Sequence, residues 1–361
     1  MVKKGEMYKG TNIKVVVCLL TFLLIITTKI KITEQAEKER DYSAIPKIGG
    51  AVNIFSRYGY LSISMRVVPR NDSDTWIFRE PTVDVFNKVI TAPPRVKSKA
   101  TVFDGDFHME FCDNVRQLLQ AYFRDFTFER MDRPWRAFTG SWSVATIARH
   151  LGINASFITQ DHCYVLVRVA RYRENKKLAG TPDSSLVLDQ SVTREADNIT
   201  VGDTAGTIKF IRNFGSHYIA SFVTGNSLYQ VFVYTPQVYQ RIKERLKTRG
   251  VAQLSSVELS NFFSPWYAEH MGTIQSASGN HSVEAWAVEN LRVQYYFFTY
   301  PSLLKLHGDA ELLYQLDDLL GNEALLQLHL KTLSPLFKDT QQRDWFLEVI
   351  DNYFKLWEVN M

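Results

Sequence analysis

The sequence lacks the motifs of the common enzyme classes. It has no glycine-rich loop for a nucleotide phosphate, no nucleophile elbow and no paired Cys/His spacing for a metal. The densest group of candidate ligands is Asp104, Asp106 and His108, but a calcium loop needs further oxygen ligands and a spaced glutamate. A turn explains these three residues better. The sequence therefore predicts a protein that is not an enzyme, with no catalytic residue, no metal site and no cofactor.

An apolar run long enough to cross a membrane is also missing. Residues 15–26 are a twelve-residue apolar run, whereas a bilayer span needs about 20 residues. The run follows a basic, polar segment, which is the layout of a secretory signal peptide. We expect residues 1–30 to be a signal peptide and the protein to be secreted; a membrane anchor is the alternative.

The chain after residue 31 carries almost no net charge. The formal net charge is +4, but six lysines and one glutamate put +5 into the first 31 residues, which leaves −1 elsewhere. Nucleic-acid binding rests on many phosphate contacts, so a nearly neutral chain gives no general case for it.

Cysteine is scarce, with three residues in 361. Cys18 lies in the predicted leader, which leaves Cys112 and Cys163 as an even pair in an oxidising compartment. The sequence predicts one disulfide between them; two buried thiols are the alternative. Four Asn-x-Ser/Thr sequons support secretion and are candidate glycosylation sites. They are Asn71, Asn154, Asn198 and Asn280.

The chain is rich in core-forming residues. Hydrophobic residues make up 45% and aromatic residues 13% of the sequence, which is enough for one large domain or two modest ones. Alternating segments predict strands within residues 48–70 and 163–172, and helical spacing predicts a helix over residues 112–123. Leucine and aromatic stripes predict that the C-terminal third is helical.

Residues 204–234 are predicted to be one helix that runs into a long strand. Thr204 is a candidate N-cap, and Gly215 stands where a left-handed residue would end the helix. From His217 the apolar period changes to two, which is typical of a strand. Residues 224–226 predict a break, after which aromatic and β-branched residues continue to Tyr234.

The five residues at this helix-to-strand junction, Phe214, Gly215, Ser216, His217 and Tyr218, resemble the signature of the membrane-attack-complex/perforin (MACPF) family. That signature is an aromatic, then Gly-Thr-His, then an aromatic, between a helix and a long central strand. The chain differs at Ser216, where the family has Thr, and at Thr207, where Trp or Tyr is common. An ordinary helix stop beside a buried structural histidine is the alternative interpretation.

The resemblance implies an α+β fold of the MACPF and cholesterol-dependent-cytolysin type, with a bent antiparallel central sheet flanked by two helical clusters. It covers about residues 105–335, after an N-terminal β-rich extension (31–104) and before a C-terminal helical tail (336–361). By resemblance, the clusters fall at residues 173–203 and 236–278, and residues 283–298 form a closing strand. In pore formers such clusters unfurl into membrane-spanning β-hairpins.

Within the family, the layout and the stretches FGSHYIASFVTGN and LGINASFITQDHCYVLVRVARYRE are similar to the insect Torso-like proteins. This resemblance implies a secreted, non-enzymatic signalling factor that helps activate the Torso receptor tyrosine kinase at embryonic termini, through the receptor's cystine-knot ligand. A pore-forming effector that perforates membranes is the alternative. We expect no perforation, because residues 173–203 are highly charged and residues 239–246 have helical period instead of the alternation that a spanning strand needs.

One surface is a candidate contact for a partner, a membrane or the extracellular matrix. Residues 239–249 predict a short amphipathic helix with Ile242 and Leu246 four apart. Basic residues surround this pair: Arg241, Lys243, Arg245, Lys247 and Arg249. Such helices bind anionic lipid or acidic partners, and a solvated face above a buried Ile/Leu pair is the alternative.

Overall fold

The fold is organised on strand β8 (His217–Tyr234), which is 18 residues long and almost wholly buried. The computed structural model describes residues 46–55, 82–93, 107–140, 142–180, 186–249, 256–295, 297–307 and 309–359. The predicted signal peptide, Asn71, Asp104, Asp106 and most of the predicted N-terminal extension lie outside these residues. The described residues all belong to the compact unit that begins at Ala44.

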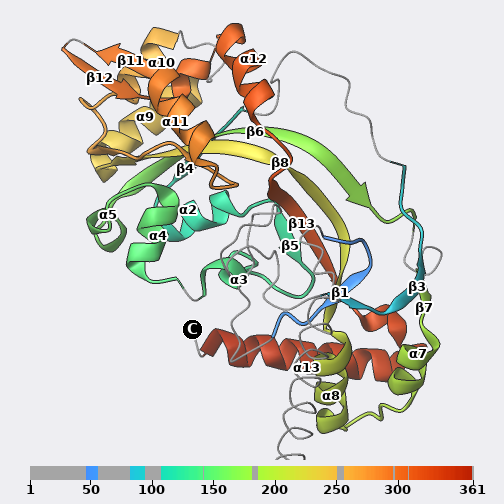
Figure 1. The fold of residues 1–361 in the computed structure, drawn as a ribbon. Helices are drawn as coiled ribbons and strands as arrows, with labels where there is room; N and C mark the ends of the chain where they lie inside the picture. The colour runs from blue at the N-terminus through green and yellow to red at the C-terminus, as the bar shows by residue number, and fades with distance from the viewer. Residues whose placement is uncertain are drawn as a thin grey trace, which may run out of the picture. The chain divides into compact units, whose positions relative to one another are not determined.

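Long strands pair with β8 along its two edges. One edge takes β6 (Cys163–Lys177) and, at the start of β8, β1 (Gly50–Val52), all antiparallel. The other edge takes β13 (Ala324–Thr332) and then the short strands β10 (Gln275–Ser276) and β9 (His270–Met271). The described part of the chain thus forms a nine-stranded sheet with β8 in its centre (Figure 1).

Outer strands and two separate pairs of strands complete the β structure. The sheet is extended by β2 (Val83–Asp84) on β1, β4 (Phe107–Cys112) on β6 and β5 (Phe126–Phe128), which is parallel to β13. The separate pairs are β3 (Phe86–Val89) with β7 (Leu186–Leu188), and β11 (Arg292–Tyr295) with β12 (Phe298–Pro301). The predicted α+β class with a large antiparallel sheet is confirmed.

The predicted break at residues 224–226 is wrong, because β8 runs through these residues without interruption. The long strands of the sheet are curved (Figure 1). The neighbours of β8 carry the irregularities: β6 shifts register between Tyr172 and Glu174, and β13 between Leu325 and Gln327. A Cβ on Gly225 would lie 2.0 Å from the carbonyl oxygen of Arg171. Gly225 therefore permits close approach of β6, and does not end the strand.

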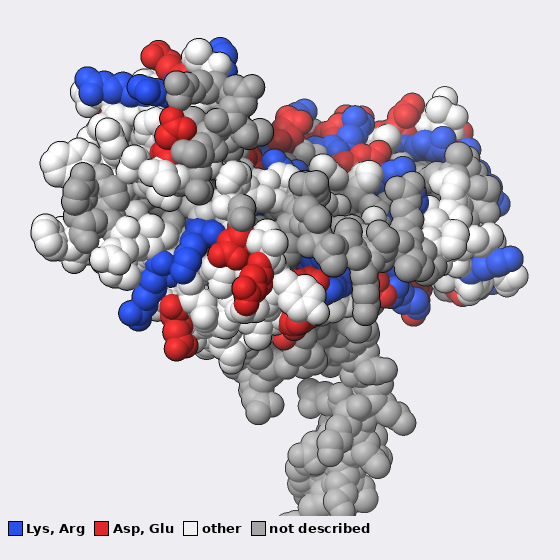
Figure 2. Space-filling view, turned by 90° about the horizontal axis from the view of Figure 1, so that it is seen from above, with Lys and Arg blue, Asp and Glu red and all other residues white. Residues whose placement is uncertain are grey.

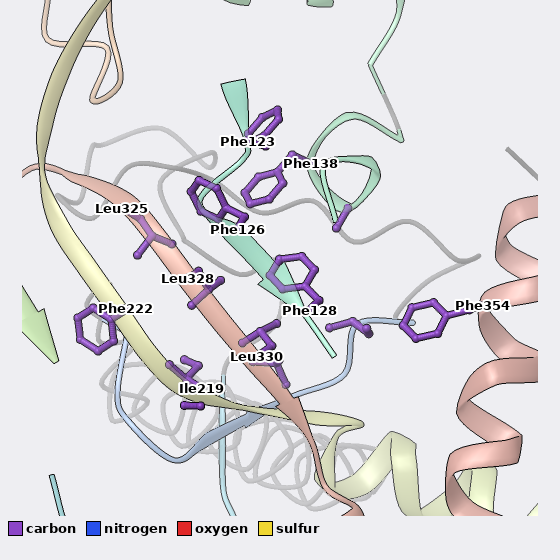
Figure 3. Packing of buried hydrophobic residues seen from close by; sticks show 14 of the residues in the cluster. Phe123, Phe126, Phe128, Phe138, Ile219, Phe222, Leu325, Leu328, Leu330 and Phe354 are labelled. Atoms are coloured by element: carbon purple, nitrogen blue, oxygen red, sulfur yellow. The ribbon is translucent and has the colours of Figure 1, made fainter. Parts of the chain in front are cut away.

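One face of the sheet is covered by elements from distant parts of the chain. They are α2 (Val115–Tyr122), α3 (Arg136–Thr139), α4 (Val144–Leu151), α5 (Ser156–Thr159), α7 (Gln190–Asp197), α8 (Thr204–Phe214), η3 (Ser334–Leu336) and α13 (Thr340–Val359). We call this layer the body. Its core is aromatic: Phe123 stacks on Phe138 with ring centroids 4.3 Å apart, and Phe126 meets Phe138 edge to face (Figure 3).

The body unites regions that the sequence assigned to different domains. The tail helix α13 buries Phe346, Ile350 and Trp357 in the body core, and β1 pairs directly with β8. Boundaries near residues 104 and 335 therefore do not separate independent cores among the described residues. An extension and a tail are each part of one packed unit.

The opposite face of the sheet is covered by the segment between β8 and β13, residues 235–323, which we call the insertion lobe. Its helices are α9 (Pro236–Arg249), α10 (Ser256–Phe262), α11 (His281–Asn290), η2 (Leu303–Leu306) and α12 (Ala310–Leu319). Its core packs Phe263, Leu303 and Leu316 against alternate residues of β6 and β8, such as Val165 and Phe232. Figure 1 shows the lobe above the sheet and α13 below it.

Three predictions about elements are corrected here. Residues 283–298 do not form a closing strand, because α11 extends to Asn290 and the separate β11–β12 hairpin follows it. The nine-residue strand β13 lies inside the segment predicted as helical. Residues 173–203 carry the end of β6, the short β7 and the single helix α7 among their described residues, so they hold no cluster of helices. Apolar runs such as Ala324–Leu328 carry no period, and only pairing with β8 selects a strand.

Among the described residues, none of the helices is sufficiently long and apolar to span a bilayer.

Candidate functional site

The helix before the predicted signature begins one residue earlier than the sequence indicated. Asp203 is the N-cap of α8, and its carboxylate accepts a hydrogen bond from Gly206 N at 2.9 Å. Thr204 is the first helical residue. Thr207 is fully buried, and its hydroxyl accepts a 3.1 Å hydrogen bond from the indole of Trp345 on α13. The position where the MACPF pattern often has an aromatic ring therefore receives one from the tail.

Gly215 holds a backbone conformation that suits glycine alone. Its φ is 93° and its ψ is 175°, so it is not the left-handed helical residue that the sequence predicted. The conformation belongs to the extended region at positive φ, which is essentially restricted to glycine. A Cβ here would lie 2.8 Å from the carbonyl oxygen of Val52. Gly215 therefore serves two purposes: it turns the chain from α8 into β8, and it lets β1 approach closely.

Ser216 and His217 tie β8 to three other segments. Ser216 N donates to Val52 O at 2.9 Å, and Ile54 N donates to the Ser216 hydroxyl oxygen at 3.2 Å. His217 Nε2 donates to Glu129 O at 3.0 Å, so Nδ1 accepts a 2.9 Å hydrogen bond from the Ser216 hydroxyl. The Glu129 carboxylate in turn accepts from Thr332 N at 2.7 Å. These contacts join β1, β8, β13 and the end of β5 at a single point.

The imidazole of His217 is neutral. Burial lowers the pKa of His217 to about 4, because the site provides no compensating charge strong enough to hold a proton. Glu129 moderates the shift but does not cancel it. With Ser216 and His217 fully buried, no solvent or substrate reaches this pair. The arrangement therefore fixes strands in place and does not form a catalytic dyad.

The flanking aromatic residues of the signature pack into the body. Tyr218 is fully buried and its ring meets Phe86 edge to face at 5.5 Å. Phe214 is half-buried and contacts Phe210 within α8 at 5.1 Å. The five signature residues are thus brought together as a structural junction at the start of the central strand.

The predicted disulfide between Cys112 and Cys163 is contradicted, because the two residues are free, buried thiols. Cys112 lies directly opposite Tyr164 in the β4–β6 pair, and Cys163 is the neighbour of Tyr164 in sequence. Adjacent strand residues point to opposite faces. Accordingly Cys112 packs in the body core and Cys163 in the lobe core. Burial raises the pKa of Cys112 to about 12, so it is held as an unreactive thiol.

The described sequons differ in accessibility. Asn154 and Asn198 are exposed at loop and helix-end positions. Asn280 is half-buried, and its amide nitrogen donates to the Glu323 carboxylate at 3.1 and 3.3 Å. A glycan is attached through this nitrogen, so modification of Asn280 would break both contacts.

The predicted basic helix is α9, and its Ile242 and Leu246 are buried in the lobe as expected. Lys243 is half-buried, forms an ion pair with Asp113 at 2.8 Å and lies over the Tyr239 ring. Arg241, Arg245 and Lys247 are exposed. The surface available for a partner is therefore three residues among those described, with Lys243 committed to the body.

Sequence reasoning missed the residues that clamp the lobe to the sheet. Gln230 on β8 is fully buried. Its amide donates to Gly272 O at 2.8 Å and Pro301 O at 3.1 Å, and its carbonyl accepts from Leu303 N at 2.8 Å. The one available signal was a glutamine inside an apolar strand, LYQVFVY, where a buried amide requires partners.

A second clamp holds α12. Arg173 on β6 donates to the carbonyl oxygens of Asp317 and Leu320 at 2.6 and 2.7 Å, and Arg171 pairs with the Asp317 carboxylate. The guanidinium groups thus bind the C-terminal end of α12, where free carbonyls favour a cation. Within the described ranges, no group of three or more His, Cys, Asp or Glu side chains could hold a metal ion.

Comparisons with known proteins complete the description. No protein-family model matches the chain, and no curated protein matches it. Among solved structures, GNIP1Aa from Chromobacterium piscinae overlaps 86% of this chain and 57% of its own, at 12% identity and a TM-score of 0.44. A putative cell invasion protein with a MAC/Perforin domain from Bacteroides thetaiotaomicron overlaps 86% and 60%, at 10% identity and a TM-score of 0.39.

A third similar structure is astrotactin-2, described as a vertebrate-specific, perforin-like membrane protein involved in neuronal development. It overlaps 84% of this chain and 96% of its own, at 13% identity and a TM-score of 0.34. The chain spans less than two thirds of the length of the first two structures. At such identities the likeness concerns the arrangement of sheet and helices, and says nothing about activity.

Proposed function

We propose that the chain is a secreted, non-enzymatic MACPF protein of the Torso-like type, which promotes activation of the Torso receptor tyrosine kinase through its cystine-knot ligand. The observation that carries the family assignment is the junction at Gly215. The five signature residues lie between a helix and the central strand, with a glycine-only conformation and a buried, neutral histidine. An accidental helix stop would not need a buried serine and histidine that, together with Glu129, join four segments.

A signalling role is favoured over perforation by the way residues 173–203 and the insertion lobe are held against the rest of the protein. A membrane-spanning hairpin needs strands of about 9 to 11 alternating residues. After the end of β6, residues 173–203 contain β7, of three residues, and α7, whose Val192 and Ala196 are buried in the body. The insertion lobe is clamped by Gln230, Arg171 and Arg173. Release of the lobe would break the contacts of these three side chains, of which Gln230 and Arg171 are buried.

The receptor assay tests the signalling proposal directly. Purified secreted protein is added to cells that express the receptor and the ligand, and receptor phosphorylation is measured. We expect phosphorylation to depend on added protein, and Gly215→Val to yield no active material. Equal phosphorylation with and without the protein would remove the signalling proposal.

Liposome leakage tests the alternative, a pore-forming effector. Dye-loaded vesicles with and without anionic lipid are mixed with micromolar protein, and the same samples are imaged. We expect no leakage and no rings. Concentration-dependent leakage with ring-shaped oligomers would favour the pore former over the signalling factor.

Peptide mapping of the secreted material tests export. We expect cleavage near residues 26–32 and glycans on Asn154 and Asn198, with Asn280 unmodified because its amide nitrogen is bonded to Glu323. An intact Met1 on an unglycosylated, intracellular product would contradict secretion.

A further inference from the structure

The exposed aromatic side chains of the described residues all belong to the insertion lobe. They are Trp266, Tyr267, Phe297, Phe298 and Tyr314. The body, with many more aromatic residues in its core, exposes none of its described aromatics to this degree. Scattered single apolar residues are normal on a surface, but a set confined to one region indicates an interaction site.

Two of these residues, including the most exposed one, are adjacent in the β11–β12 hairpin. The register closes with Tyr295 opposite Phe298, and Phe297 lies in the turn. Phe297 is 98% exposed and Phe298 is 69% exposed. Both positions are Phe, whereas hairpin turns favour Gly, Asn and Asp for conformational reasons. Turn geometry therefore does not explain Phe297 and Phe298.

The base of the hairpin is held by hydrogen bonds, whereas Phe297 and Phe298 are exposed. Gln230 binds Pro301 and Leu303, and Ser302 N donates to Leu291 O at 2.8 Å. Lys305 Nζ donates to Asn290 O at 2.9 Å. The aromatic side chains are thus presented on a fixed support, so that docking them costs little conformational entropy.

Charge around the hairpin suits a phospholipid surface. Residues 290–308 contain no Asp or Glu, and they contain Arg292 and Lys305. White side chains dominate the left edge of Figure 2, the side on which Figure 1 places the hairpin. Arg292 lies at the base of the hairpin, opposite Pro301, and this segment carries no charge that an anionic headgroup would repel. Aromatic side chains such as these are tolerated at the membrane–water interface.

The size of the tip decides between a bilayer and a protein partner. Two phenylalanines bury about 150–250 Å² each, whereas a stable protein interface buries about 800 Å² per partner. A bilayer needs no matching shape and accepts a small wedge. We propose that the β11–β12 tip is a membrane-docking site, which inserts Phe297 and Phe298 into the interfacial region of a phospholipid bilayer without crossing it.

Vesicle flotation of the full secreted protein tests this site. The probes are vesicles of phosphatidylcholine alone and of phosphatidylcholine with phosphatidylserine, each at low and high salt. We expect the double variant Phe297→Ser/Phe298→Ser to bind at least about tenfold more weakly. The matched control, Val187→Ser/Leu356→Ser, removes two exposed apolar residues outside the lobe (53% and 62% exposed) and should bind as the parent does.

Salt separates this site from the basic helix α9. Binding by the hairpin should persist at high salt and without phosphatidylserine. Binding that is lost at high salt, or in Arg241→Gln/Arg245→Gln/Lys247→Gln but not in the hairpin variant, would overturn the proposal in favour of α9.

A local probe gives a second readout. An environment-sensitive fluorophore on Phe297→Cys should shift its emission to the blue with vesicles, and the same label on Leu356→Cys should not. No vesicle binding by the parent, or no shift at position 297, would overturn the proposal. If the hairpin variant loses receptor activation but the parent binds no vesicles, the tip contacts a protein instead. If the parent binds vesicles through the hairpin but does not activate the receptor, the signalling role is rejected and the membrane-docking site stands.

Discussion

The two faces of the central sheet are covered in different ways. The body face is closed by segments from both ends of the described chain, from Ile48 to Trp357, and its core is rich in stacked aromatic rings. The lobe face is closed almost entirely by one continuous insertion between β8 and β13. The body turns its aromatic residues inward, whereas the lobe leaves five of them exposed.

The two layers are attached to the central strand in different ways, and the lobe is the one that exposes aromatic residues to solvent. The body is joined to β8 through backbone and side-chain contacts at Ser216 and His217, where four segments meet. The lobe is joined through its short strands β9 and β10, which pair with the edge of β8, and through the side chains of Gln230, Arg171 and Arg173. Because the lobe has a core of its own, on the opposite face of the sheet from the body core, its outer surface can change without disturbing the body core. Each prediction below acts on one face and leaves the other as its reference.

The largest effect is expected at the body junction, from Gly215→Val. A valine Cβ would meet Val52 O at 2.8 Å, and a β-branched residue at φ of 93° and ψ of 175° is strained. We expect a loss of stability above about 5 kcal/mol, enough to unfold a marginally stable domain. Secretion yield and circular dichroism are the measurements.

Gly202→Ala is the matched control for that substitution. Gly202 also has a φ of 93°, but a Cβ there meets nothing within 4 Å. It should cost about 1–2 kcal/mol from backbone strain alone. If the two variants were equally stable, close packing against β1 would have no part in the requirement for glycine.

On the lobe face, Gln230→Leu should cost about 4 kcal/mol, because Gly272 O, Pro301 O and Leu303 N lose their partner. Hydrogen exchange should accelerate in residues 270–306 while α13 stays protected. Gln275→Leu is the control, since the Gln275 amide bonds only to the exposed Thr273 hydroxyl among the contacts described. Uniform acceleration across the two faces would show that the lobe has no separate attachment.

A smaller effect, about 3 kcal/mol, is expected from pH at the body junction. An unfolded-state histidine binds a proton below about pH 6.5, whereas folded His217 has a pKa of about 4. The unfolded state therefore takes up the proton first, and stability falls as the pH drops from 6.5 to 4. Urea unfolding across this range is the measurement.

His217→Asn should flatten this pH dependence. Burial also lowers the pKa of His270 and His329, so His270→Gln/His329→Gln is the comparison and should keep most of the slope. A slope that is unchanged in His217→Asn would mean that His217 is not the main titrating group.

The smallest effect is expected from reducing agent. Cys112 faces the body and Cys163 faces the lobe, so the melting temperature should be the same with and without a reductant. A disulfide closing a loop of about 50 residues would add about 4 kcal/mol on the chain-entropy model. Alkylation after unfolding, without reduction, should label these two thiols. A cross-linked peptide pair in non-reducing mass spectrometry would contradict the structure.

Much of the fold was predictable where one period persists over many residues. The helix ending at Phe214, the strand at Cys163 and the C-terminal helix with Trp345 and Phe346 are confirmed. Prediction was wrong at residues 283–298 and missed β13. Short apolar runs fit a helix or a strand equally well, and only the partner strand selects between them. The disulfide was wrong because residue counting cannot show to which face a cysteine points.

The sequence by itself determined that a glycine must stand between helix and strand, that a histidine follows it, and that the chain has enough apolar residues for a large core. These are local properties of side chains and of backbone conformation. The tertiary structure alone decided that Val52 O forbids a Cβ at Gly215, that Gln230 holds two lobe segments, and that Phe297 is left in solvent. Each of these depends on atoms far apart in sequence that come together only after the sheet has formed.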